Sequence, residues 1–323
     1  MNESKNGFLV ISLDFELLWG VFDVVDFEKK RIYFENTRQV IPKILEEFNF
    51  HNIHATWATV GMLFHKNWEE WERNSPKTPP TYSNPKLSAY EFGKTIKSGN
   101  SENLCFAPEL IREIAQNPGQ EIGTHTYSHY YCLEEGQTLA SFKADLEKSI
   151  ELAKQMGIEI KSLVFPRNQF REDYLRVCYE LGITNVRSNP SSWYWENPAS
   201  DSILTKLART GDAYFPLGKK SYSIKEMIKN HNLLVEQKAG RFLRPAESNS
   251  ILHKLKIRRI KKEMSLAAEN NEIYHLWWHP HNFGDNPSQS IQDLKSILTH
   301  FEKLREKFNF QSVNMCEMGK RIS

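Results

Sequence analysis

The sequence has few cysteines, no long apolar run and almost no net charge. Its 323 residues include four scattered cysteines without a CxxC pair, so a disulfide framework is not expected. The 42 lysines and arginines nearly balance the 40 aspartates and glutamates. This balance gives no support for nucleic acid as a partner.

Segments long enough to cross a membrane are also lacking. The first apolar run, FLVISL at residues 8–13, is followed directly by an acid and is too short for a signal peptide. Together with cysteines that we expect to be reduced, these absences predict a cytoplasmic protein without a membrane span. The sequence gives no indication of the oligomeric state.

Short apolar runs alternate regularly with amphipathic helical patterns. This alternation predicts an α/β fold with a parallel sheet, and six or seven such units fit a barrel better than an open sheet. Two long excursions, Asn67–Asn103 and Asn189–Asn232, are expected to cover one end of the barrel. The strands are predicted at residues 8–13, 53–60, 120–124, 162–165, 184–187, 273–278 and 311–315, and the helices at residues 35–50, 108–116, 139–156, 171–181 and 291–308.

The segment EIGTHTYSH places His125 and His129 four positions apart, directly after a short apolar run. Two interpretations are open: polar residues on a loop, or two ligands of one metal ion. In an extended chain the two residues would lie roughly 13 Å apart, whereas one helical turn brings their Cβ atoms within about 5–6 Å. Because a zinc–nitrogen bond is only about 2.0–2.1 Å long, metal binding predicts a helical turn here.

Ionisable side chains follow four of the predicted strands. Because the carboxyl ends of parallel barrel strands converge on one face, these side chains are expected to meet there. Each has an ordinary structural explanation when taken alone, but their joint placement favours a metal site. The residues are Asp14 and Glu16, then His125 and His129, then Arg167, and last His279 and His281.

These residues resemble the motifs of the polysaccharide deacetylase family, the carbohydrate esterases that share the NodB homology domain. The segment THTYSH, with His125 and His129, is similar to the family's histidine motif, and LWWH, ending at His279, is similar to its last motif. The family's first motif, Thr-Phe-Asp-Asp, resembles Ser12–Glu16, but Phe15 stands where the family has its metal-binding aspartate.

The resemblance implies one deacetylase-like domain over residues 1–323. Its expected fold is a distorted (β/α)7 barrel, similar to a TIM barrel, with long insertions at the carboxyl-terminal face. Glu16 is expected to replace the missing aspartate and to bind a divalent ion together with His125 and His129. Zinc is the default ion, and iron, cobalt or nickel would fit the same ligands.

The resemblance also implies catalytic roles. Asp14 is expected to be the catalytic base and Arg167 to hold it in position. His279 is expected to be the general acid, with His281 as a second candidate for that role. Independently of the resemblance, the aromatic faces of Trp19 and Trp193 near the proposed site are expected to pack on a sugar ring. Tyr130, through a backbone N–H nearby, and His281 are also expected to bind substrate.

The expected activity is that of a metal-dependent hydrolase that removes an N-acetyl group from a sugar of a polysaccharide, or of its intracellular precursor, and releases acetate. Two alternatives stay open: a catalytically weak member that binds a saccharide, and a hydrolase of a non-sugar amide or cyclic imide. A two-carboxylate glycosidase that uses Asp14 and Glu16 is less favoured, because that chemistry does not need the histidines.

Overall fold

The computed structural model describes residues 6–169, 171–190, 194, 204, 205, 211, 212, 214, 218–230, 234–247 and 250–322. Its strands are β1 (Phe8–Phe15), β2 (Ala55–Thr59), β3 (Gln120–Thr124), β4 (Ser162–Val164), β5 (Asn185–Ser188), β6 (Ser221–Tyr222), β7 (Ile228–Asn230), β8 (Leu234–Lys238), β9 (Arg241–Phe242), β10 (Ile273–Trp278) and β11 (Gln311–Val313). Its α-helices are α1 (Arg31–Phe50), α2 (Trp68–Arg73), α3 (Ala89–Ile96), α4 (Glu102–Cys105), α5 (Pro108–Gln116), α6 (Leu139–Gln155), α7 (Glu172–Glu180), α9 (Ser250–Glu269), α10 (Pro287–Phe308) and α11 (Met315–Lys320).

Parallel strand pairing runs from β10 through β1, β2, β3, β4 and β5 to β8. Strands β8 and β9 belong to one extended segment, and β9 pairs in parallel with β10 on the other side of the gap. Between them, the N–H of Ala239 donates to the carbonyl of Ser188, and the N–H of Gly240 donates to the carbonyl of His275. This segment therefore joins the two ends of the sheet and nearly closes a ring of seven parallel strands. The predicted distorted (β/α)7 barrel is confirmed.

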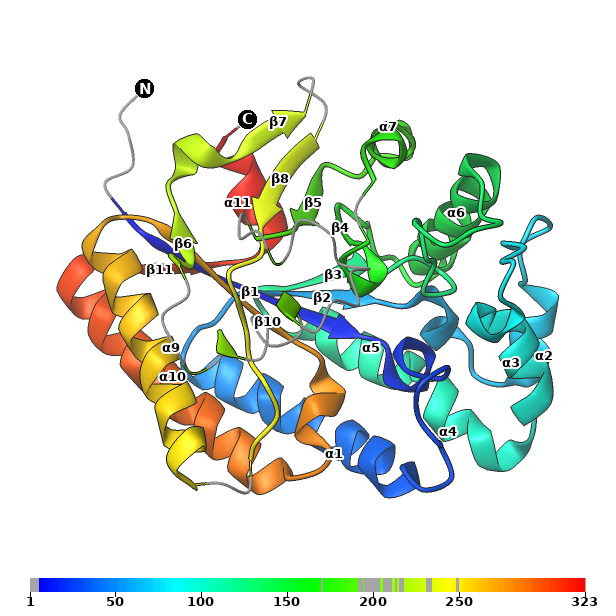
Figure 1. Ribbon diagram of the computed structural model, residues 1–323, viewed down its shortest axis with the longest axis horizontal. Coiled ribbons are helices and arrows are strands. Elements are labelled where there is room, and N and C mark those ends of the chain that lie inside the picture. Colours follow the sequence, from blue (N-terminus) through cyan, green and yellow to red (C-terminus); the bar gives the residue numbers. More distant parts are fainter. Residues whose placement is uncertain are drawn as a thin grey trace.

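Strand β1 lies between β10 and β2 in the sheet, and all eight of its residues are buried. Burial on both faces explains its nearly continuous apolar sequence, because a barrel strand packs against the interior on one side and helices on the other. Figure 1 shows α1, α10 and α9 side by side along one flank of the sheet. In α1 the predicted apolar stripe is buried; its residues are Val40, Ile41, Ile44, Leu45 and Phe48.

The strands that the sequence predicted are all present, and β3, α5 and β10 have the predicted bounds. Helix α10 begins at Pro287 and not at Ile291, because the side chain of Asn286 caps its N-terminus by accepting from the N–H of Gln289. The segment that forms β8 and β9 was not predicted. Its sequence from Leu234 to Phe242 mixes charged and small residues, so it lacks a strand pattern.

The first predicted excursion folds over the carboxyl end of β1. It forms α2, α3 and α4, which Figure 1 shows gathered beside that end of the strand. Trp19, in the 3-10 helix η1 (Leu17–Gly20), packs against Trp68, Trp71 and Phe106 and is fully buried. Its side chain has no surface left for a sugar, so the prediction that Trp19 binds substrate is wrong.

Much of the second predicted excursion, Asn189–Asn232, lies outside the described residues. Trp193 belongs to that part, so its predicted role in substrate binding stays a prediction. Among the described helices, none combines the length and the apolar character that crossing a membrane would require.

Candidate metal centre

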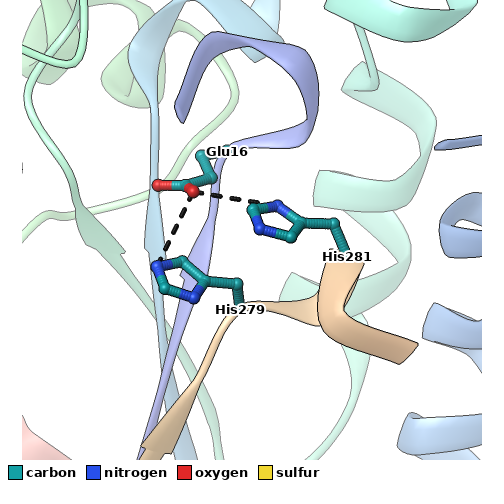
Figure 2. A group of neighbouring side chains, drawn as sticks. All are labelled: Glu16, His279 and His281. Carbon is teal, nitrogen blue, oxygen red and sulfur yellow. Dashed lines mark ion pairs between the residues drawn. The ribbon is translucent and has the colours of Figure 1, made fainter. Parts of the chain in front are cut away.

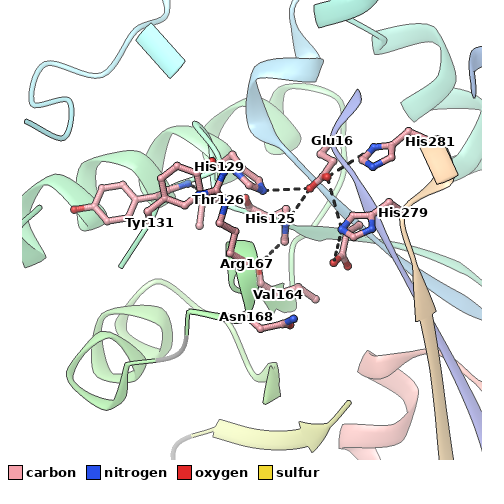
Figure 3. A network of polar contacts seen from close by, with 12 residues as sticks. Glu16, His125, Thr126, His129, Tyr131, Val164, Arg167, Asn168, His279 and His281 are labelled. Carbon is pink, nitrogen blue, oxygen red and sulfur yellow. Dashed lines mark hydrogen bonds and ion pairs between the residues drawn. The ribbon is translucent and has the colours of Figure 1, made fainter. Parts of the chain in front are cut away.

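Four histidines surround the carboxylate of Glu16 at the carboxyl ends of β1, β3 and β10 (Figure 3). Oε2 of Glu16 lies 3.4 Å from Nε2 of His125 and 3.2 Å from Nε2 of His129. Oε1 lies 3.7 Å from Nε2 of His279 and 3.7 Å from Nδ1 of His281 (Figure 2). The predicted convergence of residues from distant parts of the chain is therefore present in the structure.

The two histidines of the EIGTHTYSH segment meet without a helical turn. Residues 125–129 form an irregular loop, and their imidazole rings lie 5.0 Å apart between centroids. The loop reverses at Thr126 (φ 64°) and His129 (φ 56°), which both adopt the left-handed backbone conformation. The predicted helical turn is wrong, because two left-handed residues shorten the span between positions four apart just as effectively.

Non-glycine residues with a strained, left-handed backbone cluster at the strand ends around Glu16. Eight non-glycine residues in the described part of the chain have a positive φ, and five of them follow β1, β3 or β4. A β-branched residue such as threonine rarely adopts this conformation, so surrounding contacts must hold it there. The five residues are Leu17, Thr126, His129, Arg167 and Asn168.

Hydrogen bonds fix the orientation of both imidazoles. Nδ1 of His125 donates to the carbonyl of Val164 at 2.8 Å, which leaves Nε2 with a free lone pair directed toward Glu16. Nδ1 of His129 and the hydroxyl of Tyr131 share a hydrogen bond of 3.1 Å. Partners of this kind on the far nitrogen are typical of metal-binding histidines, since they set the tautomer and the ring plane.

A buried carboxylate on α6 holds the loop between the two histidines. Asp145 accepts from the backbone N–H of Tyr127 at 2.7 Å and from the N–H of Ser128 at 3.1 Å. The Ser128 hydroxyl also donates to this carboxylate. Burial raises the pKa of Asp145 to about 7, although these donors act in the opposite direction. Sequence reasoning missed this residue, which lies in the middle of a helix with no motif around it.

The Glu16 side chain is 2% exposed, and its Oε2 has no hydrogen-bond partner. Burial would raise the pKa of Glu16, but the surrounding imidazoles of His279, His125 and His129 hold it well below its ordinary value. Ligand atoms around a tetrahedral zinc ion lie about 3.3 Å apart when each bond is 2.0–2.1 Å long. The separations of 3.2 and 3.4 Å match this spacing, so Glu16, His125 and His129 fit a divalent ion.

Asp14 is held by Arg187, a residue that sequence reasoning missed. Both guanidinium nitrogens donate to it, Nη1 to Oδ1 and Nη2 to Oδ2, each at 2.7 Å. Burial would raise the pKa of Asp14, but the charge and hydrogen bonds of Arg187, together with the nearby imidazoles of His125 and His279, hold it below its ordinary value. Arg187 lies in β5, near the carboxyl end of a strand that was predicted. The expectation that side chains at the carboxyl ends of parallel strands converge on one face, which predicted the other site residues, applies to Arg187 as well.

Further contacts keep Arg187 in place. Its Nη1 donates to the Ser12 hydroxyl at 3.0 Å, and its Nη2 donates to the side-chain oxygen of Asn168 at 3.2 Å. The guanidinium also lies over the Trp277 ring, 4.3 Å from the centroid. Because these contacts fix the Arg187 guanidinium on three sides, the carboxylate of Asp14 that it binds is held in one orientation.

Arg167 does not contact Asp14, so the prediction that it holds the base is wrong. Its Nη2 donates to Asp23, at 2.6 Å from Oδ1, and its guanidinium lies over the Tyr131 ring at 4.4 Å. Arg167 has a left-handed backbone (φ 54°), and its side chain contacts this pair and not Asp14.

His279 is the most accessible of the four histidines. Its side chain is 23% exposed, compared with 5% or less for the other three. Nδ1 of His279 lies 3.4 Å from the amide nitrogen of Asn282, and Nε2 lies 3.7 Å from Oδ2 of Asp14. A molecule that approaches the site can therefore reach His279 first.

Two predicted substrate-binding residues are placed elsewhere. His281 is buried and faces Glu16, so it belongs with the candidate metal ligands; burial lowers its pKa to about 3, which keeps the imidazole neutral. Tyr130 is fully buried, and its hydroxyl is bonded to the hydroxyl of Ser141 and the carbonyl of Thr138. Neither side chain offers an exposed face, and the backbone N–H of Tyr130 already donates to a threonine hydroxyl at 2.7 Å, so the prediction that Tyr130 and His281 bind substrate is wrong.

Comparisons with known proteins give one family match and several structures of similar fold. The model of the family described as polysaccharide deacetylase matches residues 22–186, just over half of the chain. The matched range includes His125 and His129, whereas Asp14, Glu16 and Arg187 lie outside it. A comparison with curated proteins gives no match.

Several solved structures have a similar fold. A Mycobacterium smegmatis protein named as a polysaccharide deacetylase is 12% identical, with a TM-score of 0.61 over 100% of this chain and 92% of its own. A Pseudomonas aeruginosa PAO1 protein with the same kind of name is 9% identical (TM-score 0.56, 98% and 91% coverage). The allantoinase PuuE is 11% identical (TM-score 0.56, 98% and 91% coverage). At such low identity these likenesses concern the fold alone.

Proposed function

This chain belongs to the polysaccharide deacetylase family, and we propose that it is a metal-dependent hydrolase that removes an N-acetyl group from a carbohydrate and releases acetate. The observation that carries this proposal is the buried group of Glu16, His125 and His129, with ligand atoms spaced for one ion. One carboxylate and two imidazoles leave further positions on the ion open, as a hydrolytic centre requires. Zinc is the ion that this ligand set favours first.

When bound, the ion supplies positive charge that polarises the amide carbonyl and lowers the pKa of water. The proton transfers of the reaction are carried out by side chains of the protein. Their positions beside Glu16 decide which of them can accept a proton and which can donate one.

Asp14 is the proposed base that takes the proton from the attacking water. Arg187 keeps its pKa low, so the carboxylate is ionised at neutral pH and ready to accept. Two parallel hydrogen bonds from Arg187 also fix the carboxylate plane. The oxygen of the attacking water forms the new bond to the acetyl carbon while Asp14 holds its proton.

His279 is the proposed acid that protonates the leaving amine. Its Nε2 lies beside both carboxylates, and its partial exposure places it where a sugar can approach. The bond between the acetyl carbon and the nitrogen breaks as the nitrogen receives this proton, so acetate and a free amino sugar leave. His281 is too deeply buried to reach a leaving group, which favours His279 for this role.

The experiment that tests the proposal is an acetate-release assay with N-acetylglucosamine oligosaccharides, performed on metal-free protein and after addition of one equivalent of zinc. We expect release only with zinc. Asp14→Asn should keep the zinc ion that Glu16, His125 and His129 would hold and lose turnover, whereas His129→Gln should lose both that ion and turnover. Turnover that survives complete metal removal would contradict the proposal.

A small cyclic amide in the same assay separates the proposed reaction from the competing one. Acetate release from the sugar without ring opening of the cyclic amide supports the deacetylase. Ring opening without acetate release would assign the alternative hydrolase activity to the same residues.

A further inference from the structure

The two oxygens of Glu16 face different pairs of histidines. Oε2 faces His125 and His129, the pair to which the proposed function assigns the ion, and Oε1 faces His279 and His281 (Figure 3). Because the two pairs reach Glu16 from opposite sides, they do not surround a common point.

The second pair has the composition of a metal site on its own. The ligand atoms of Glu16, His279 and His281 all lie within 4.8 Å of one another. Among the described residues, this group and the first one are the two that meet that criterion. The imidazole rings of His279 and His281 lie nearly parallel, 4.9 Å apart at 8°, with their nitrogens turned toward the same oxygen (Figure 2).

Each half of the site also contains a buried polar atom without a hydrogen-bond partner. On the first side it is Oε2 of Glu16, and on the second side it is Nδ1 of His281. An unpaired buried nitrogen is costly, because it has lost its water and gained nothing in return. A cation between Nδ1 of His281 and Oε1 of Glu16 would satisfy it.

We propose that Glu16, His279 and His281 form a second divalent-cation site, joined to the first by the bridging carboxylate of Glu16. Paired ions in two-metal sites typically lie about 3.5–4 Å apart, a distance that one bridging carboxylate can span. Asp14 adds negative charge, since its Oδ2 lies 3.7 Å from Nε2 of His279. The ligand separations of 3.7 Å exceed those of the first site, so the second ion binds more weakly.

Occupation of the second site has a consequence that rests on the proposed function. An ion there coordinates Nε2 of His279, the nitrogen that would otherwise protonate the amine. Excess metal therefore removes the acid of the proposed reaction. Binding of the second ion itself does not depend on that reaction.

The experiment is a count of zinc bound by metal-free protein, measured by equilibrium dialysis with elemental analysis over increasing free zinc. Wild-type protein is expected to bind two equivalents, the second more weakly than the first. His281→Gln and His129→Gln are each expected to bind one, and the double variant none. His300→Gln, which changes a histidine on α10 outside the site, is the matched control and should still bind two.

Cobalt(II) gives an independent measurement. In wild-type protein the paramagnetic resonance signal per cobalt should fall when the second equivalent binds, because the bridged ions couple; His281→Gln should show no such fall. Saturation of the wild type at one equivalent, or two equivalents in His281→Gln with a normal unfolding transition, would overturn the second site. Protein that can bind two zinc ions but releases no acetate even at one equivalent would refute only the proposed function. Protein that releases acetate at one equivalent but saturates at a single bound ion would refute only the second site.

Discussion

Arg187 and Asp14 form a buried ion pair at the end of the barrel, and each depends on the other. The side chains are 1% and 3% exposed, so neither charge has access to water. Breaking a buried pair by removing one partner commonly costs about 3–5 kcal/mol, because the remaining charge stays unpaired. The pair therefore contributes to the stability of the native state as well as to the orientation of the proposed base.

Substituting Arg187 tests this role at the level of one residue. Arg187→Gln should lower kcat by at least about 100-fold, since the base loses its orientation. Loss of the nearby positive charge should also raise the pKa of Asp14, so the acidic limb of the kcat profile moves to higher pH. Both effects are measured by steady-state kinetics across pH with zinc present.

Arg167→Gln is the matched control for that substitution, because Arg167 pairs with Asp23 and does not touch Asp14. The decrease in kcat caused by Arg167→Gln should be at least tenfold smaller than that caused by Arg187→Gln, and the acidic limb of its kcat profile should not shift. If the two variants behave alike, the assignment of Arg187 is wrong. Arg187→Lys keeps the charge and serves if the glutamine variant does not fold.

At this scale the sequence was informative about residue types and less so about contacts. The positions of Asp14, Glu16, His125 and His129 followed from strand ends, which converge in any parallel barrel. The choice between two arginines depended on tertiary contacts, since Arg167 pairs with Asp23 and Arg187 pairs with Asp14. No pattern of residue types encodes these pairings.

Helix α6 holds the loop between His125 and His129 through the carboxyl group of Asp145. This group is buried and partly protonated near neutral pH. In the native state the pKa of Asp145 is about 7, above its ordinary value of 3.8. The folded form therefore holds the proton more strongly than the unfolded form does. This contribution to stability is fully present below about pH 4 and is lost as the pH rises through 7.

Asp145→Asn should change the pH dependence of stability in a defined direction. The amide cannot ionise, so the stability of the variant relative to wild type should rise by up to about 4 kcal/mol between pH 4 and pH 7 and then level off. Urea unfolding at intervals of one pH unit measures this difference. A difference that is constant across that range would show that Asp145 does not titrate as described.

The 3-10 helix η1 returns the chain over Glu16 and leaves room for the carboxylate only because residue 20 is glycine. A Cβ at Gly20 would overlap the carboxyl atoms of Glu16. Gly20→Ala should therefore displace Glu16 and weaken zinc binding by at least about tenfold, measured by competition with a chelating dye. Gly99→Ala, where an added Cβ meets nothing within 4 Å, is the control and should bind zinc like the wild type.

For the molecule as a whole, closure of the barrel depends on the close approach of three backbones at Gly240. A Cβ there would lie 2.7 Å from the carbonyl oxygens of both His275 and Lys220. Backbone atoms cannot move aside as a flexible side chain can, so Gly240→Ala should destabilise the fold by about 1–3 kcal/mol. Thermal and urea unfolding measure the change, and Gly99→Ala should stay within about 0.5 kcal/mol of wild type. Equal stability of the two variants would mean that the barrel does not need this contact.

Most strands and helices of the barrel could be predicted from the sequence, because each has a recognisable local pattern of apolar residues. The closure of the barrel could not be predicted in this way. The segment from Leu234 to Phe242 pairs with β5 at one end and with β10 at the other, and its neighbours, not its own pattern, make it a strand. Likewise, the left-handed residues that bring His125 and His129 together are imposed by the loop's partners, Asp145 among them.

Glu16 is synthesised early, whereas His279 and His281 emerge from the ribosome only after most of the chain. Strand β10, which pairs with β1, is the last of the strands that carry these ligands to be synthesised. During translation one carboxylate oxygen can therefore meet its histidine partners while the other still faces solvent. The direction of synthesis gives the His125–His129 side the first chance to capture an ion, and the opposite side is completed only when β10 inserts.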